Sequence, residues 1–108
     1  MNYQARIERI FKAWQLRDWN FIESRLTADF TFTSPHDDHL QRADFKEKCW
    51  DMIEEIGEFE IVTIVAGAGE AFVRYKNTIN GEKVQNTEHF IFEGEKLKEV
   101  IVFFGLPE

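Results

Sequence analysis

The sequence lacks several features that would assign it to large classes of protein. Its 108 residues include one cysteine, Cys49, so an intramolecular disulfide is excluded and a reducing compartment is expected. No apolar run approaches the length of a membrane span. The charged, amphipathic first residues also lack the apolar stretch of a signal peptide. We therefore predict a cytoplasmic protein with no membrane partner.

Basic residues are scarce as well. Thirteen Lys and Arg stand against twenty Asp and Glu, which leaves a formal net charge of −7. A face that binds a phosphate backbone needs clustered Lys and Arg, so we expect no nucleic-acid partner. The chain contains no G-x-G-x-x-G, no P-loop and no Cys–His zinc spacing. We therefore expect no cofactor.

Apolar side chains are abundant instead. Hydrophobic residues make up 44% of the chain and aromatic residues 15%, including eleven Phe, which is typical of a globular protein. No internal repeat, linker or low-complexity segment is visible. Residues 1–108 are therefore expected to form one domain that is large enough to bury a core.

Helical patterns dominate the first half of the chain. Apolar residues recur at helical spacing over residues 2–17. A second, short helix is predicted to begin near Asp18 or Asn20, and Asn20 opens a plausible capping box. A third helix is predicted over residues 44–57, where Gly57 occupies the C-cap position.

Strand patterns follow and then dominate. The strand-like runs cover residues 29–34, 58–66, 70–78, 83–93 and 97–104. The last three runs are joined by two tight turns, at Asn80-Gly81 and at Gly94-Glu95. Such turns predict two consecutive β-hairpins.

The turn lengths predict which residues face one another. With two-residue turns, Val73 faces Glu88, Glu88 faces Ile101, and Asn86 faces Phe103. Because side chains alternate along a strand, this register divides the sheet into two faces. The inner face is predicted to carry Ala71, Val73, Tyr75, Val84, Asn86, Glu88, Phe90, Phe92, Leu97, Ile101 and Phe103. The apolar residues predicted for the outer face are Phe72, Ile91, Val100, Val102 and Phe104.

The order of these elements also resembles a known family. The pieces that carry the resemblance are DFTFTSP at 29–35, Asp37-Asp38, Cys49-Trp50, NTEHF at 86–90 and VFFG at 102–105. Together they resemble the SnoaL-like branch of the nuclear transport factor 2 superfamily, which includes the ketosteroid isomerases. The resemblance implies an α+β fold in which a curved, mostly antiparallel mixed sheet wraps around helices and forms a cone with an apolar cavity. It also implies that polar residues in the cavity perform acid–base work.

Glu88 is the first candidate catalytic residue. It shares the predicted inner face with Tyr75 and Asn86, so a carboxyl group lies beside a phenol in an apolar pocket. Desolvation there would raise the pKa of the carboxyl toward neutrality and suit it to act as a base or an acid. The alternative is that Glu88 pairs with Arg74 or a helix residue and only shapes the pocket.

The segment 34–39 is the densest polar cluster. His36 and Asp38 are its candidate catalytic members, Asp38 because the family resemblance places an acidic pair there. Two histidines and a carboxylate would also satisfy a facial metal triad. Adjacent loop residues seldom all point to one centre, so we expect no metal. A purely structural turn remains the alternative.

Aromatic residues suggest the walls of a ligand pocket. The candidate ligand-binding residues are Trp14, Phe32, Trp50, Tyr75, Asn86 and Phe103. Such a lining suits a small, flat hydrophobic ligand, although the same side chains would also serve as an ordinary core. Cys49 is interpreted as a small buried hydrophobe and not as a nucleophile.

Two functions follow from these residues. The first is an isomerase, cyclase or hydrolase that uses Glu88, Asp38 or a histidine to carry protons on a hydrophobic metabolite. The second is a non-catalytic ligand-binding or dimeric assembly module. In both cases the apolar outer face, together with the family resemblance, predicts a homodimer.

Overall fold

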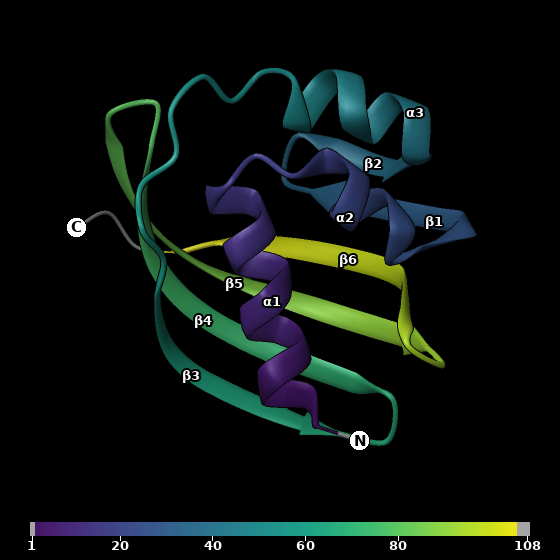
Figure 1. Ribbon diagram of the computed structural model, residues 1–108. Coiled ribbons are helices and arrows are strands. Elements are labelled where there is room, and N and C mark those ends of the chain that lie inside the picture. The colour runs from purple at the N-terminus through teal and green to yellow at the C-terminus, as the bar shows by residue number, and fades with distance from the viewer. Residues whose placement is uncertain (1, 106–108) are drawn as a thin grey trace.

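The computed structural model describes residues 2–105 as a strongly curved six-stranded sheet with helices on its concave side (Figure 1). The helices are α1 (Tyr3–Gln15), α2 (Trp19–Ser24), α3 (Arg42–Phe45) and the π-helical turn η1 (Lys46–Trp50) that continues α3. The strands are β1 (Leu26–Ser34), β2 (Asp37–Leu40), β3 (Glu60–Gly67), β4 (Glu70–Ile79), β5 (Glu82–Glu93) and β6 (Lys96–Phe104). The strand order is β2-β1-β6-β5-β4-β3, and only the β1–β6 pair is parallel.

Side-chain caps define the first two helices. The Asn2 side chain accepts a hydrogen bond from the Ala5 amide, and α1 then runs to Gln15. The Asp18 side chain caps α2 by accepting from the Phe21 amide at 3.1 Å. The prediction of a start near Asp18 is therefore confirmed, and the capping box at Asn20 is wrong.

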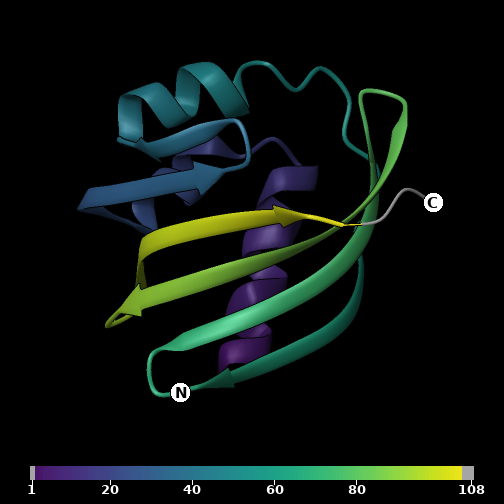
Figure 2. The same ribbon diagram turned by 180° about the vertical axis from the view of Figure 1, so that it is seen from behind.

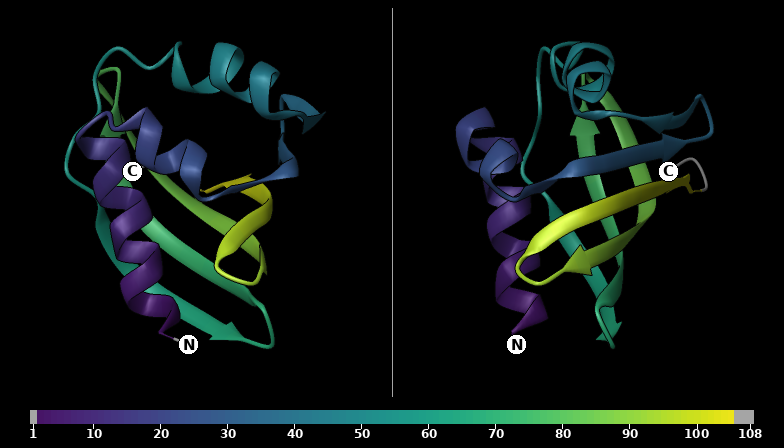
Figure 3. Two further views of the ribbon diagram at one scale, coloured as in Figure 1. Left: turned by 45° about the vertical axis from the view of Figure 1, so that its right-hand side comes forward. Right: turned by 90° about the vertical axis from the view of Figure 1, so that its right-hand side faces the viewer.

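The third helix differs more from its prediction. It begins at Arg42, its N-cap residue makes no side-chain capping bond, and its last turn is π-helical and ends at Trp50 (Figure 3). Gly57 is not its C-cap, because the Gly57 amide donates to the Thr78 carbonyl at 2.8 Å. The helix instead has Asp51 as its C-cap, and the segment after it is hydrogen-bonded to the β4–β5 hairpin, which local capping signals could not reveal.

The segment predicted as a polar loop contains a strand. β1 begins at Leu26, earlier than expected, and pairs in parallel with β6. After the turn at residues 35–36, β2 returns antiparallel to β1, with Phe32 opposite Leu40. Figure 3 shows β1 and β6 side by side, with α3 above them.

The two predicted hairpins have different outcomes. The β4–β5 register is confirmed, with Val73 opposite Glu88. The β5–β6 register agrees only next to the turn, because β6 contains a bulge between Leu97 and Glu99. The bulge reverses the faces of the residues beyond it.

This reversal corrects the predicted faces of β6. Val102 lies opposite Glu88 and is only 8% exposed, whereas Phe103 lies opposite Thr87 and is 51% exposed. Val100 is also buried. The prediction that Ile101 and Phe103 face inward is therefore wrong, as is the outward placement of Val100, Val102 and Phe104.

The core lies between α1 and the concave face of β4, β5 and β6. Phe11 of α1 has its ring centroid 4.7 Å from Phe59, 5.0 Å from Tyr75 and 6.1 Å from Phe90. Aromatic packing of this kind positions α1 across the sheet (Figure 1). None of the helices in residues 2–105 is long and apolar enough to cross a membrane.

Candidate functional site

A cavity of about 300 Å³ lies between the C-terminal half of α1, the segment that follows η1 and the inner face of the sheet. Aromatic residues form much of its wall: Phe11, Trp14, Phe32, Phe59, Tyr75 and Phe104. Polar residues also line it: Ser34, His36, Asp37, Lys48, Asn80, Asn86 and Glu88. An apolar cavity with a few converging polar groups is the usual form of a small-molecule site.

Three polar side chains from neighbouring strands meet in the wall of this cavity. Tyr75 of β4 lies opposite Asn86 of β5, and Glu88 follows two residues later on the same face. The Tyr75 hydroxyl lies close enough to the Glu88 carboxyl group to lower the pKa of Glu88 as a hydrogen-bond donor, and Asn86 Nδ2 lies 3.5 Å from the Tyr75 oxygen. The Gly105 amide donates to Asn86 Oδ1 at 3.3 Å, which turns the Asn86 amide nitrogen toward Tyr75.

The surroundings change the acidity of two of these groups. Burial raises the pKa of Glu88 to about 7, and the hydrogen bond from Tyr75 opposes that rise. Burial and the nearby Glu88 charge raise the pKa of Tyr75 well above its usual value. At neutral pH Tyr75 is therefore a hydrogen-bond donor, while Glu88 is divided between its two protonation states. Glu88 can both accept and release a proton there.

The polar segment 34–39 contributes the edge of the cavity. His36 and Asp37 line it, and the His36 ring meets Phe104 edge to face at a centroid distance of 5.4 Å. Asp38 lies outside: its side chain is 89% exposed and contacts His39. Because β2 alternates its side chains, only one member of the acidic pair can face the cavity, and it is Asp37.

Two predicted ligand-binding residues lie outside the cavity. Trp50 is buried behind Trp14, and the centroids of the two rings are 4.5 Å apart. The Arg17 guanidinium carbon lies over the Trp50 ring, 4.1 Å from its centroid. Phe103 is on the opposite face of the sheet because of the bulge in β6. Apart from these two and Asp38, the structure brings the predicted site residues together, namely Trp14, Phe32, His36, Tyr75, Asn86 and Glu88.

Phe104 and Val102 are cavity residues that the sequence prediction missed. The sequence did contain a signal for the bulge that places them there. Strict alternation from Leu97 would point the charged Glu99 into the core, and a bulge at Lys98 avoids this cost. Lys98 and Glu99 are two consecutive charged residues inside an apolar strand, and they therefore indicated that the side chains beyond them change face.

Cys49 also lines the cavity. Burial, together with the Asp37 charge, raises the pKa of its thiol to about 11. The thiol is therefore protonated at neutral pH and is a poor nucleophile. Residues 2–105 contain no group of three or more His, Cys, Asp and Glu side chains placed to hold a metal ion.

Comparison with known proteins identifies the family. The model of the SnoaL-like domain family matches residues 7–100. No match was found among curated proteins.

Solved structures share the fold at low sequence identity. A nuclear transport factor 2-like protein of unknown function from Burkholderia xenovorans has a TM-score of 0.82 and 15% identity, covering 97% of this chain and 84% of its own. A candidate ketosteroid isomerase from Kribbella flavida has a TM-score of 0.82 and 16% identity, covering 96% and 78%. An epoxide hydrolase from M. tuberculosis has a TM-score of 0.74 and 16% identity, covering 94% and 80%. These likenesses agree with the cone-shaped α+β architecture.

Proposed function

Because the chain belongs to the family of SnoaL-like domains, we propose that it binds a small apolar molecule in the cavity and moves a proton on it through Glu88. The observation that carries this proposal is a carboxyl group with a pKa of about 7 in the wall of an aromatic cavity. A group with this pKa is suited to general acid–base catalysis near neutral pH.

The cavity favours a proton shift within one molecule. In such a reaction one carboxylate removes a proton from a carbon next to a carbonyl group and returns it to another carbon of the same molecule. Glu88 alone can perform both steps, and the hydroxyl of the protonated Tyr75 stabilises its carboxylate form before the proton is taken up. The candidate ketosteroid isomerase among the structural neighbours agrees with this reaction class.

Hydrolysis is a second candidate, supported by the epoxide hydrolase with the same fold. It needs an acid for the leaving oxygen and a base for the attacking water. His36 and Asp37 at the edge of the cavity are the groups available for the second role. Because both lie at the rim and Glu88 lies in the wall, the proton shift is the better supported of the two.

Isotope exchange tests the proton transfer without knowledge of the natural substrate. We expect a panel of cyclic ketones to exchange hydrogen for deuterium at the carbons next to the carbonyl group, measured by NMR in D₂O. Glu88→Gln should slow this exchange about 10²–10⁴-fold. Glu82→Gln on the exposed end of the same strand is the matched control and should exchange at the wild-type rate.

The outcomes separate catalysis from binding. Exchange that persists in Glu88→Gln would remove Glu88 from the reaction. Quenching of Trp14 fluorescence by the ketones, with no exchange above the buffer rate in the wild type, would favour the non-catalytic binding module. Cyclic epoxides opened by the wild type but not by Glu88→Gln would instead favour hydrolysis.

The outer face of the sheet is proposed as a homodimer interface. No described helix covers this face of β3–β6 (Figure 2). Its exposed large apolar side chains include Val65, Phe72 and Phe103, at 63%, 42% and 51% exposure. His89 stacks on Phe72 with ring centroids 4.1 Å apart, which extends the flat surface. Exposed apolar area of this kind commonly marks a protein–protein contact.

Charge substitution tests the dimer. The wild type is expected to sediment as a dimer, and Phe103→Glu should shift it to a monomer, because a charge would be buried at the interface. Leu16→Glu at the end of α1 changes an apolar residue on the helical side that is more exposed than Phe103 and should leave the dimer intact. A monomeric wild type at micromolar concentration would end this proposal.

A further inference from the structure

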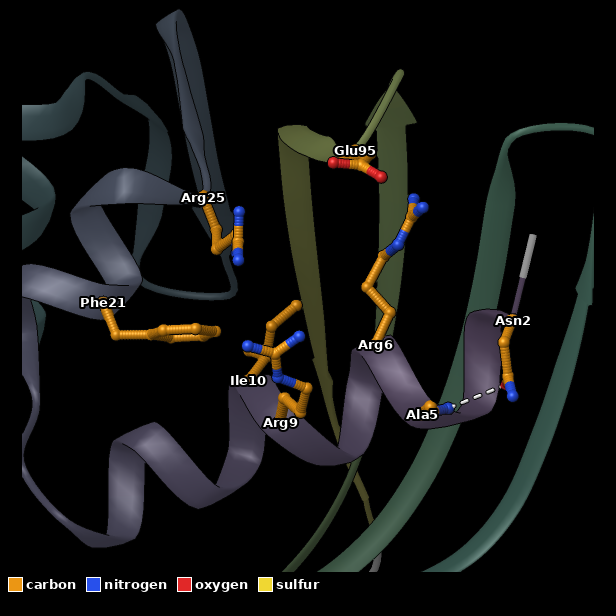
Figure 4. A pocket seen from close by; sticks show the side chains of 8 residues that line it. All are labelled: Asn2, Ala5, Arg6, Arg9, Ile10, Phe21, Arg25 and Glu95. Carbon is orange, nitrogen blue, oxygen red and sulfur yellow. Dashed lines mark hydrogen bonds between the residues drawn. The ribbon is translucent and has the colours of Figure 1, made fainter.

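A second hollow, of about 180 Å³, lies beside the N-terminal half of α1, away from the Glu88 cavity. Figure 4 shows that α1, the end of α2 and the β5–β6 turn surround it. Arg6 and Arg9 reach it from α1, Arg25 follows α2, and Phe21 extends toward them from α2. We call Arg6, Arg9 and Arg25 with this hollow the arginine pocket.

The charge of the arginine pocket is unusual for this chain. The protein as a whole carries a net charge of −7, yet the pocket gathers three guanidinium groups against one carboxylate, Glu95. Among residues 2–105, no carboxylate lies within ion-pair distance of Arg9 or Arg25. The pocket therefore holds an excess of two positive charges that the described residues do not neutralise.

Contacts with the protein hold the three guanidinium groups in place. The Arg6 side chain donates to the Gly94 carbonyl at 3.0 Å. The guanidinium carbons of Arg9 and Arg25 lie 5.3 Å and 4.9 Å from the centroid of the Phe21 ring. The Arg25 carbonyl accepts from the Leu97 amide, so its backbone is tied to β6. Such stacking leaves the guanidinium N–H groups free to bind an anion.

We propose that the arginine pocket binds the phosphate group of a small phosphomonoester. Guanidinium groups match the oxygens of a phosphate with paired hydrogen bonds, and a monoester carries close to two negative charges at neutral pH, which equals the excess in the pocket. Phe21 and the buried Ile10 provide apolar contact for the organic part. The hollow is smaller than the roughly 300–1,000 Å³ of sites for drug-sized ligands, so the ligand is compact.

Calorimetry with phenyl phosphate and phenyl sulfate tests the proposal. The two probes share their shape, but the sulfate carries a single charge. We expect saturable binding of phenyl phosphate that tightens as pH rises through about 6, where the second proton leaves the phosphate. Phenyl sulfate should bind more weakly, with no such pH dependence. Glu95→Gln should tighten phenyl phosphate binding, because it removes the one opposing charge.

Arginine variants test whether phenyl phosphate binds in the arginine pocket. The double variant Arg9→Gln and Arg25→Gln should weaken phenyl phosphate binding roughly tenfold or more. Arg74→Gln, an exposed arginine on β4, is the matched control and should bind as the wild type does. Circular dichroism checks that each variant is folded.

Three results would overturn the proposal. The first is equal weakening by Arg74→Gln, which would indicate non-specific charge attraction. The second is equal affinity for phenyl sulfate and phenyl phosphate at all pH values. The third is binding to vesicles containing phosphatidic acid without binding to phenyl phosphate, which would make a lipid surface the source of the phosphate group. None of these results depends on Glu88, so they leave the proposed proton transfer untouched.

Discussion

Replacing Glu88 by Gln should make the stability of this protein less dependent on pH. Burial raises the pKa of Glu88 from 4.5 to about 7 in the folded protein. Between these values the folded chain keeps a proton that the unfolded chain has released. The free energy of unfolding therefore falls as pH rises, by at most roughly 3–4 kcal/mol in total. Gln is neutral at every pH, so the variant lacks this loss.

The magnitude within an accessible pH range follows from the same two pKa values. About 2 kcal/mol of the loss falls between pH 5.5 and 8.5, because the remainder has accrued at lower pH. The Glu88→Gln variant should therefore gain about 2 kcal/mol relative to wild type across this range. Glu88 lines the cavity and is partly accessible, which makes this figure an upper bound.

Urea unfolding followed by tryptophan fluorescence measures this difference, at one protein concentration so that any dimerisation is held constant. The three Trp residues of the chain provide the signal. Glu82→Gln removes a carboxylate from the exposed start of the same strand, and its difference from wild type should stay constant with pH. A Glu88→Gln difference that is flat from pH 5.5 to 8.5 would refute the assignment of a near-neutral pKa to Glu88.

Three further results are expected. Tyr75→Phe removes the hydrogen bond that opposes the raised pKa of Glu88, so this pKa should move above about 7 in a carbon-13 NMR titration of the carboxyl group; a lower value would contradict the hydrogen bond. If Glu88 acts as a base, the rate of deuterium exchange should rise with pH and level off above about 7, whereas a flat profile would assign the base elsewhere. Gly105→Ala would place a Cβ 1.8 Å from the Gln85 carbonyl oxygen. It should lower the free energy of unfolding, measured with urea, by about 1–3 kcal/mol. A Cβ at Gly67 meets no atom within 4 Å, so Gly67→Ala should leave the free energy of unfolding unchanged.

The Glu88 cluster could be predicted from the sequence because its contacts depend on one short turn. Asn80 and Gly81 both have positive φ, at 50° and 82°, as a two-residue primed turn requires. Once that turn is placed, strand alternation puts Tyr75, Asn86 and Glu88 on one face without further information. The first helix could be predicted equally well, because its apolar stripe and its Asn2 cap involve only residues close together in the sequence.

The positions that could not be predicted depend on contacts between distant segments. The bulge in β6 decides that Phe104 and not Phe103 faces the cavity, and β2 decides that Asp37 and not Asp38 does. Trp50 is an aromatic residue of the kind that lines cavities, yet the packing of α1 against η1 places it behind Trp14.

The sequence by itself therefore determined the α+β fold, the β4–β5 register and the meeting of Glu88 with Tyr75. Each of these follows from a turn, a cap or a period that spans a few neighbouring residues. Only the tertiary structure decided which aromatic residues enclose Glu88, how far burial raises its pKa, and that two arginines of α1 and the arginine that follows α2 share one hollow. These properties depend on which distant segments pack together, and packing is a property of the folded chain as a whole.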